Sequence, residues 1–147
     1  MAATEWSWAP LAADFNNDGF KDIYITNGIP GATNDLDFVN FIANENIQRR
    51  LAAGMQDEDL EFIKELPEKK TVNYFFENQQ GQKFTDRTGV WSAQQATFSS
   101  GASYADFDND GDKDIFKVNG ELKHLYGQED QLFENVDVEK FNDISVE

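Results

Sequence analysis

The amino-acid sequence predicts a mainly β fold, with about two four-stranded antiparallel sheets and a helical insertion in the first. Three features predict it: a long segment recurs along the chain, the recurring parts carry β-branched and aromatic residues, and one stretch that does not recur has apolar residues at helical spacing. A packed core is expected, since 39% of the residues are hydrophobic and 13 of them are Phe.

The repeat is visible in two pairs of segments. Ala12–Gly28 returns as Tyr104–Gly120 at an offset of 92 residues. A second pair has an offset of 57 residues; in it, the motif Phe-Phe-Glu-Asn, which ends at Asn78, returns as Leu-Phe-Glu-Asn, which ends at Asn135. The difference of 35 residues indicates an extra segment in the first unit. The basic unit is then about 55–60 residues long, the size of one propeller blade.

Each unit contains segments typical of strands. Small residues at Ala9–Ala13 and Gly101–Ala105 let neighbouring strands approach closely, and the β-branched and aromatic segments Ile23–Thr26 and Ile115–Val118 follow. Asn-Gly pairs after these segments are expected to mark turns. Two hairpins complete the units, formed by Val72–Glu77 with Lys83–Thr88 and by Gln131–Glu134 with Lys140–Ser145.

The extra segment has a different pattern. From Asp35 to Leu66 the apolar residues fall at helical spacing, with Gly54 as a break and Pro67 as a stop. Two short helices are therefore expected, as a decorative insertion or, alternatively, as a helical face that binds a partner. The expected organisation is a first blade from residues 1–28 and 71–97, an insertion at 29–70, and an incomplete second blade at 98–147.

Each repeat has an acidic loop between its small-residue segment and its β-branched segment, at Asp14–Asp22 and at Asp106–Asp114. Oxygen-bearing residues stand at loop positions 1, 3, 5 and 9, and Gly stands at position 6, where a sharp bend needs a permissive residue. Alternate residues of such a loop converge on one point. The expected ligands of the first loop are Asp14, Asn16, Asp18, the carbonyl of Phe20, and Asp22. Those of the second are Asp106, Asp108, Asp110, the carbonyl of Asp112, and Asp114.

Calcium is the ion that these ligands favour, because Ca²⁺ takes six to eight oxygens in a flexible cage. The chain has no Cys and one His, which disfavours zinc, and magnesium seldom takes an all-protein cage. We therefore expect two Ca²⁺ ions, one in each loop. The second loop offers four carboxylates against three in the first, so we expect it to bind calcium more tightly.

Composition restricts the partners. The formal net charge of −16 repels nucleic-acid phosphates and anionic membranes. No apolar run approaches about 18 residues, so no membrane insertion is expected. Met1–Pro10 has neither the basic start nor the apolar run of a signal peptide.

The loops, with the short aliphatic strand after each, resemble the FG-GAP/VCBS repeat family, which includes the integrin α-subunit propellers. The closer likeness is to bacterial VCBS-repeat proteins related to cartilage acidic protein. It is carried by Trp6–Pro10 before the first loop, Thr26–Gly28 after it, and Asn73–Asn78 with Phe84–Asp86 between the loops. The likeness covers most of 1–28 and 71–120, and 131–145 weakly.

The resemblance implies a β-propeller with calcium in its loops, extracellular or on the cell surface, and typically used in adhesion or ligand recognition. We therefore expect a calcium-stabilised scaffold or adhesion module for a protein or glycan ligand, and we do not expect an enzyme. A closed propeller needs about four to eight blades, so further blades or copies of the chain are expected partners. The alternative is a polysaccharide lyase or hydrolase on a propeller, because paired carboxylates can act as acid and base on sugars. The patterned acids are, however, already assigned to the calcium loops.

Overall fold

The computed structural model describes residues 4, 6–29, 36, 39–40, 43–53, 70–92, 94–120, 129–136 and 140–145. The chain divides into two compact units, one formed by Met1–Gly28 with Lys70–Glu147 and the other by Ile29–Lys69. The second unit spans the residues expected for the insertion to within one position at its end. No helix in the described residues has the length and apolar character needed to cross a membrane.

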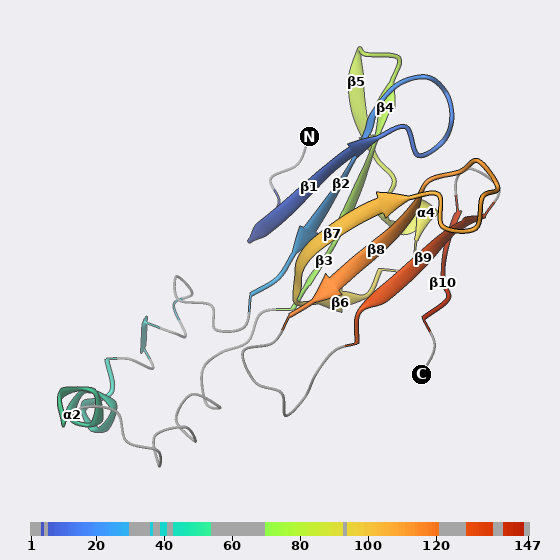
Figure 1. Ribbon diagram of the computed structural model, residues 1–147. Coiled ribbons are helices and arrows are strands. Elements are labelled where there is room, and N and C mark those ends of the chain that lie inside the picture. The colour runs from blue at the N-terminus through green and yellow to red at the C-terminus, as the bar shows by residue number, and fades with distance from the viewer. Residues whose placement is uncertain are drawn as a thin grey trace. The chain divides into compact units, whose positions relative to one another are not determined.

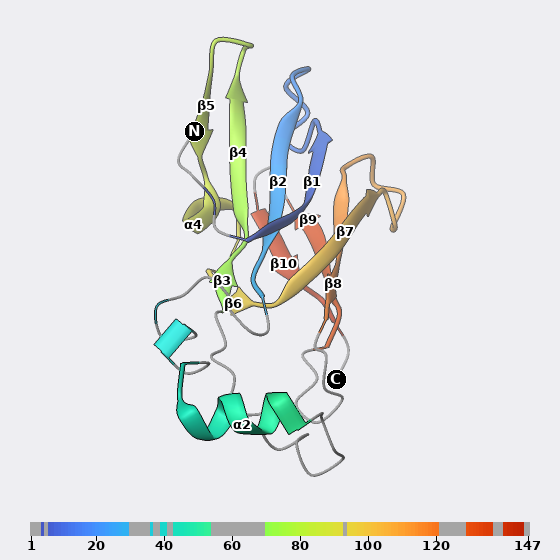
Figure 2. The same cartoon turned by 90° about the vertical axis from the view of Figure 1, so that its left-hand side faces the viewer.

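The first sheet has four antiparallel strands in the order β1, β2, β4, β5 (Figure 1). These are β1 (Ser7–Ala13), β2 (Asp22–Asn27), β4 (Tyr74–Gln79) and β5 (Lys83–Asp86). Figure 2 shows the four strands side by side. The turn between β4 and β5 places Gln80 and Gly81 at φ values of 53° and 77°, a left-handed pair that suits a tight hairpin.

The second sheet repeats this arrangement, with β7, β8, β9 and β10 as neighbours in that order. Its strands are β7 (Ser99–Ala105), β8 (Asp114–Asn119), β9 (Gln131–Val136) and β10 (Lys140–Asp143). The small-residue strands β1 and β7 lie against each other, as expected of segments that permit close approach. The predicted mainly β fold with antiparallel sheets is thus confirmed.

Two local features differ from the sequence expectation. The predicted strand Val72–Glu77 is split at Asn73 into β3 (Thr71–Val72), which pairs with β6 (Ala96–Thr97), and β4. At the break, the side-chain oxygen of Asn73 accepts the backbone N–H of Asn27, at the end of β2, at 2.8 Å. The short helix α4 (Thr88–Trp91) was not expected.

The Asn-Gly pairs also differ, because they end strands rather than form turns. Gly28 follows β2 and donates its N–H to the carbonyl of Trp6, and Gly120 donates in the same way to the carbonyl of Phe98. The side-chain amide of the preceding Asn donates to a backbone carbonyl in each case: Asn27 to Val72 at 2.9 Å and Asn119 to Glu129 at 2.7 Å.

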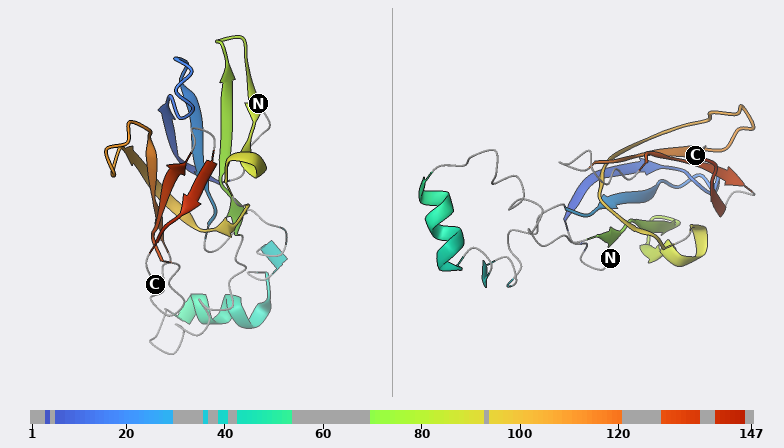
Figure 3. Two further views of the ribbon diagram at one scale, coloured as in Figure 1. Left: turned by 90° about the vertical axis from the view of Figure 1, so that its right-hand side faces the viewer. Right: turned by 90° about the horizontal axis from the view of Figure 1, so that it is seen from below.

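The core lies where the two sheets face each other (Figures 2 and 3). Phe15 is fully buried there and meets Phe75 of the first sheet and Phe141 of the second in edge-to-face contacts, with ring centroids 6.2 and 5.9 Å apart. Phe75 stacks on Phe141 at 4.9 Å and meets Trp91 at 5.7 Å. These aromatic contacts join the two sheets through one face of each.

The unit Ile29–Lys69 contains the helix α2 (Glu45–Ala53). Asn44 caps this helix, because its side-chain oxygen accepts the N–H of Asn46 at 3.0 Å. The helix expected over Asp35–Gly54 is therefore interrupted just before Asn44, where the chain forms a turn and a bend. The second expected helix, at Asp57–Leu66, lies outside the described residues.

Candidate metal centre

The two acidic loops connect equivalent strands, β1 to β2 and β7 to β8, and they bend in the same way. Position 6 has positive φ in both, 91° at Gly19 and 101° at Gly111, as expected. Position 4 is also left-handed, at 55° for Asn17 and 64° for Asn109. Sequence reasoning missed these two Asn residues, although Asn is one of the few side chains that tolerate this region.

The first carboxylate of each loop is held by the amide of the position-6 Gly. Gly19 donates to Asp14 Oδ2 at 2.8 Å, and Gly111 donates to Asp106 Oδ2 at 3.1 Å. The second oxygen differs. Asp14 Oδ1 accepts the N–H of Asp18 at 3.1 Å, whereas Asp106 Oδ1 is buried and has no hydrogen-bond donor among the described residues. A buried carboxylate oxygen without a donor is what a cation would satisfy.

The last carboxylate of each loop is buried, and backbone amides hold it in place. Asp22 Oδ2 accepts the N–H of Phe15 at 3.1 Å, and Oδ1 accepts that of Asn78 at 2.8 Å. Burial raises the pKa of Asp22, and these two hydrogen bonds oppose the rise. The second loop repeats both bonds: Asp114 accepts from Phe107 and Asn135 at 2.8 and 2.9 Å. Each oxygen keeps a lone pair for an ion.

In the second loop, three carboxylates converge. Asp106, Asp108 and Asp114 each place one oxygen within 4.8 Å of the others. The hydrogen bond from the Asp110 backbone lowers the pKa of Asp108. Desolvation, the charges of Asp110 and Asp114 and a side-chain hydrogen bond with Asp110 together outweigh it, so the pKa is raised overall. Converging carboxylates repel one another, and a hard divalent cation relieves that repulsion. The donor set therefore fits Ca²⁺. The first loop has Asp14, Asn16 and Asp22 at the same positions.

The position-5 residues do not belong to this cluster. Asp18 Oδ1 accepts the N–H of Phe20 at 2.8 Å, and Asp110 Oδ1 accepts that of Asp112 at 2.9 Å, so each folds back on its own loop. Asp18 and Asp110 are exposed, and one oxygen of each remains for a metal.

The expected carbonyl ligands stand at position 7. The Phe20 side chain is exposed. The Asp112 carboxylate accepts the side-chain amide N–H of Asn17 at 2.6 Å, which joins the two loops.

Asn78 and Asn135 connect the loops to the rest of each sheet, a function that sequence reasoning did not assign. Beyond their backbone bonds to the last carboxylate, their side-chain amides donate to the carbonyls of Lys21 and Lys113, at 3.0 and 3.3 Å. Asn135 also donates to the carbonyl of Phe15 at 2.8 Å. The recurrence of this Asn at an offset of 57 residues was the available signal.

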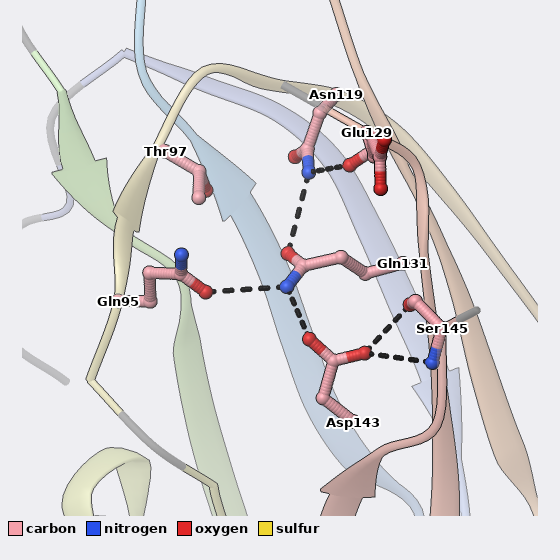
Figure 4. Close-up of a pocket in the computed structure, with 7 residues that line it drawn as sticks. All are labelled: Gln95, Thr97, Asn119, Glu129, Gln131, Asp143 and Ser145. Carbon is pink, nitrogen blue, oxygen red and sulfur yellow. Dashed lines mark hydrogen bonds between the residues drawn. The ribbon is translucent and has the colours of Figure 1, made fainter. Parts of the chain in front are cut away.

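A polar pocket of about 450 Å³ lies elsewhere on the same unit (Figure 4). Its side chains satisfy one another: the Gln131 amide donates to Gln95 and Asp143 and accepts from Asn119. Burial raises the pKa of Asp143, but hydrogen bonds from Ser145 and Gln131 and the charge of Lys117 outweigh it, so the pKa is lowered overall. A sugar-cleaving general acid needs the opposite shift.

Comparison with protein families, with curated proteins and with solved structures finds no match for this chain.

Proposed function

We propose that the chain is a non-catalytic calcium-binding module of the FG-GAP/VCBS repeat type, with one Ca²⁺ in each acidic loop and its two sheets as propeller blades. The observation that carries this proposal is the convergence of Asp106, Asp108 and Asp114 within 4.8 Å, together with the buried Asp106 oxygen that lacks a donor. The matching arrangement of Asp14, with its position-6 Gly, supports a second ion in the first loop.

In this proposal the ion stabilises the joint between the first two strands of each sheet. Asp22 and Asp114 are anchored to β4 and β9 by the amides of Asn78 and Asn135. An ion held by these carboxylates therefore connects three strands of one sheet. Because the unfolded chain does not present the ligands together, the free energy of calcium binding adds to the free energy of unfolding.

Stabilised sheets of this kind suit a scaffold or an adhesion surface for a protein or glycan, outside the cell where calcium is abundant. The enzyme alternative, a polysaccharide lyase or hydrolase, has weaker support. The acidic residue of the polar pocket, Asp143, has a lowered pKa and is held by Ser145 and Gln131. It is therefore poorly suited to donate a proton.

Thermal unfolding with calcium and with excess EDTA tests the proposal. At a free calcium concentration about 1,000 times the dissociation constant, one site adds about 4 kcal/mol to the free energy of unfolding. We expect calcium to raise the melting temperature strongly. The variant Asp106→Asn is expected to lose the second loop's share of the rise, whereas Asp108→Asn is expected only to reduce it, with Mg²⁺ far less effective in every case.

The matched control is Glu45→Gln, which removes an exposed carboxylate from α2 outside both loops. It is expected to keep the full calcium response. Equal melting temperatures of the unaltered protein in calcium and in EDTA would contradict the proposal.

A further inference from the structure

One face of the second sheet is exposed although its counterpart in the first sheet is buried. Phe15 follows β1 and has no exposed surface, whereas Phe107 occupies the same position after β7 and is 51% exposed. Phe15 is buried because it packs between the two sheets, against Tyr104 and Phe141. Nothing in the described residues covers Phe107 in that way.

The strands beside Phe107 show the same difference. The first-sheet face that packs on the second sheet carries Tyr24, Thr26 and Phe75, at 3%, 0% and 2% exposure. Their counterparts are Phe116 and Leu132, both half-buried, and Val118, which is 37% exposed. Phe116 and Leu132 pair directly across β8 and β9, so they share a face. We call Phe107, Phe116, Val118 and Leu132 the Phe107 face.

The first sheet holds the groups that would receive this face. The second sheet receives Phe15 through an edge-to-face contact with Phe141 and by donating the Asn135 amide to its carbonyl at 2.8 Å. The matching residues of the first sheet are Phe84, which is half-buried on the edge strand β5, and Asn78. Asn78 keeps the bond to its own loop, but the described residues contain no counterpart of the bond to Phe15.

We propose that a second copy of this chain docks on the Phe107 face, head to tail. Phe107 of one copy then lies against Phe84 of the next and offers its carbonyl to Asn78 there, as Phe15 does with Phe141 and Asn135 within one chain. The argument for a second copy is that each chain carries both halves of a contact it already makes internally. This proposal goes beyond calcium binding and does not depend on it.

A head-to-tail contact repeats, so it forms a ring when the rotation closes. The described residues of each copy supply two four-stranded sheets, and sheets of this kind close into rings of about four to eight, which corresponds to about two to four copies. The net charge of −16 opposes association. Salt at about 0.15 M shortens the range of this repulsion to about 8 Å, so the experiment uses that ionic strength.

Sedimentation equilibrium of the purified chain at increasing concentration tests the proposal, in calcium and again in EDTA. The unaltered chain is expected to form a defined oligomer of two to four copies, and Phe107→Ser is expected to remain monomeric. The control Val90→Ser changes an equally apolar position that is 65% exposed on α4 and is expected to associate normally. A monomeric unaltered chain, or a Phe107→Ser variant that associates like the control, overturns the proposal.

Cross-linking tests the head-to-tail geometry, since the chain has no Cys of its own. A mixture of Phe107→Cys and Phe84→Cys chains is expected to form a disulfide-linked pair under a mild oxidant, and either variant alone is not. Circular dichroism verifies that both variants fold. A cross-linked pair from Phe107→Cys alone indicates face-to-face association instead and overturns the proposed geometry. Association that persists in EDTA while calcium leaves the melting temperature unchanged would refute the calcium proposal alone.

Discussion

The two sheets make equivalent hydrogen bonds between side chains and backbone. They differ in the side chains that do not take part in these bonds. At the end of the first sheet, Asp86 accepts the Thr88 N–H and hydroxyl at 2.9 and 2.6 Å. In the second sheet, Asp143 accepts the same two groups of Ser145 at 3.1 and 2.6 Å. The strand entrances match too, since Ser7 donates to the Asn27 side chain at 2.8 Å and its counterpart Ser99 makes the same bond at 3.0 Å.

This difference teaches which positions the fold fixes. Residues that satisfy buried backbone groups are the same or chemically similar in both sheets, as with Thr88 and Ser145, because an unpaired backbone group is expensive to bury. The residues that differ in character lie among those that meet the ion, the other sheet or solvent. Asn16 of the first repeat corresponds to Asp108 of the second, and Ile25 corresponds to Lys117. Each divergent or shared pair can be tested by exchanging or removing it.

The largest expected effect concerns a shared pair, the buried carboxylates Asp22 and Asp114. Asp22→Ala and Asp114→Ala each remove the acceptor for two backbone N–H groups. At about 1–3 kcal/mol per unsatisfied group, each variant is expected to lose about 2–6 kcal/mol of unfolding free energy. Urea unfolding in excess EDTA measures this without the metal contribution. The corresponding Asn variants, which keep one oxygen, serve as controls, and equal stability of Ala and Asn variants would refute the structural function.

The next effect separates Gly28 from its counterpart Gly120. Gly28 has φ of +110°, and a Cβ there would lie 2.2 Å from the carbonyl oxygen of Thr97. A Cβ on Gly120 would meet only the Ser100 side chain: its hydroxyl at 2.9 Å, which can rotate away, and its Cβ at 3.3 Å. We expect Gly28→Ala to reduce the free energy of unfolding by about 2–4 kcal/mol and Gly120→Ala by less than about 1 kcal/mol. Similar losses of unfolding free energy for the two variants would contradict the proposed difference in packing around Gly28 and Gly120.

The third effect concerns Lys117, which is 2% exposed and lies over the ring of Phe133. In the first sheet, Ile25 takes the place of Lys117 and Phe76 takes the place of Phe133. Burial lowers the pKa of Lys117 to about 8, and the charge of Asp143 partly opposes this. Above about pH 8 the folded chain releases this proton, while the unfolded chain keeps it until about pH 10.4. The unfolded state binds more protons in that window, so this residue makes stability rise with pH there.

Denaturant unfolding at several pH values measures the rise, which is expected to reach about 2 kcal/mol between about pH 8 and pH 9.5. Lys117→Ile, which introduces the residue of the first sheet, is expected to remove it. Lys83→Ile on the exposed edge of β5 is the control and should leave the rise intact. An unchanged rise in the Lys117 variant would place its origin in another group.

The smallest expected effect concerns the divergent ligand pair Asn16 and Asp108. An added carboxylate strengthens a calcium site, so Asn16→Asp is expected to tighten the first loop about tenfold, about 1.4 kcal/mol, and Asp108→Asn to weaken the second by a similar factor. The amide signals of Gly19 and Gly111 report the two loops separately in an NMR titration. The opposite order of affinities in the unaltered chain would show that loop geometry outweighs charge.

The sequence predicted the features that depend on a periodic pattern. The strands β2 and β8 and the two loops that precede them follow from alternation, repeats and Gly at a bend. It did not predict the functions of Asn44, Asn73 and Asn135, because a single side chain that bonds to a distant backbone leaves no periodic trace.

The candidate metal centre illustrates the same limit. The spacing of the acidic residues predicted Asp106, Asp108 and Asp114 as ligands of one ion, and the structure brings their carboxylates together. The same spacing predicted Asp110 as a ligand, but the Asp110 carboxylate accepts the backbone N–H of Asp112 instead. A rotamer that satisfies the backbone of its own loop competes with the metal position, and residue identity alone does not decide between the two.

The hydrogen bond from Asn135 to Phe15 joins residues 120 positions apart in the chain, and Ile29–Lys69 lies within the loop it closes. For a flexible chain, the entropy of closing a loop grows only with the logarithm of its length. The inserted unit therefore adds about 0.4 kcal/mol to the closure free energy, less than the net value of one hydrogen bond. This small entropic penalty explains why the first repeat tolerates so large an additional segment between β2 and β3.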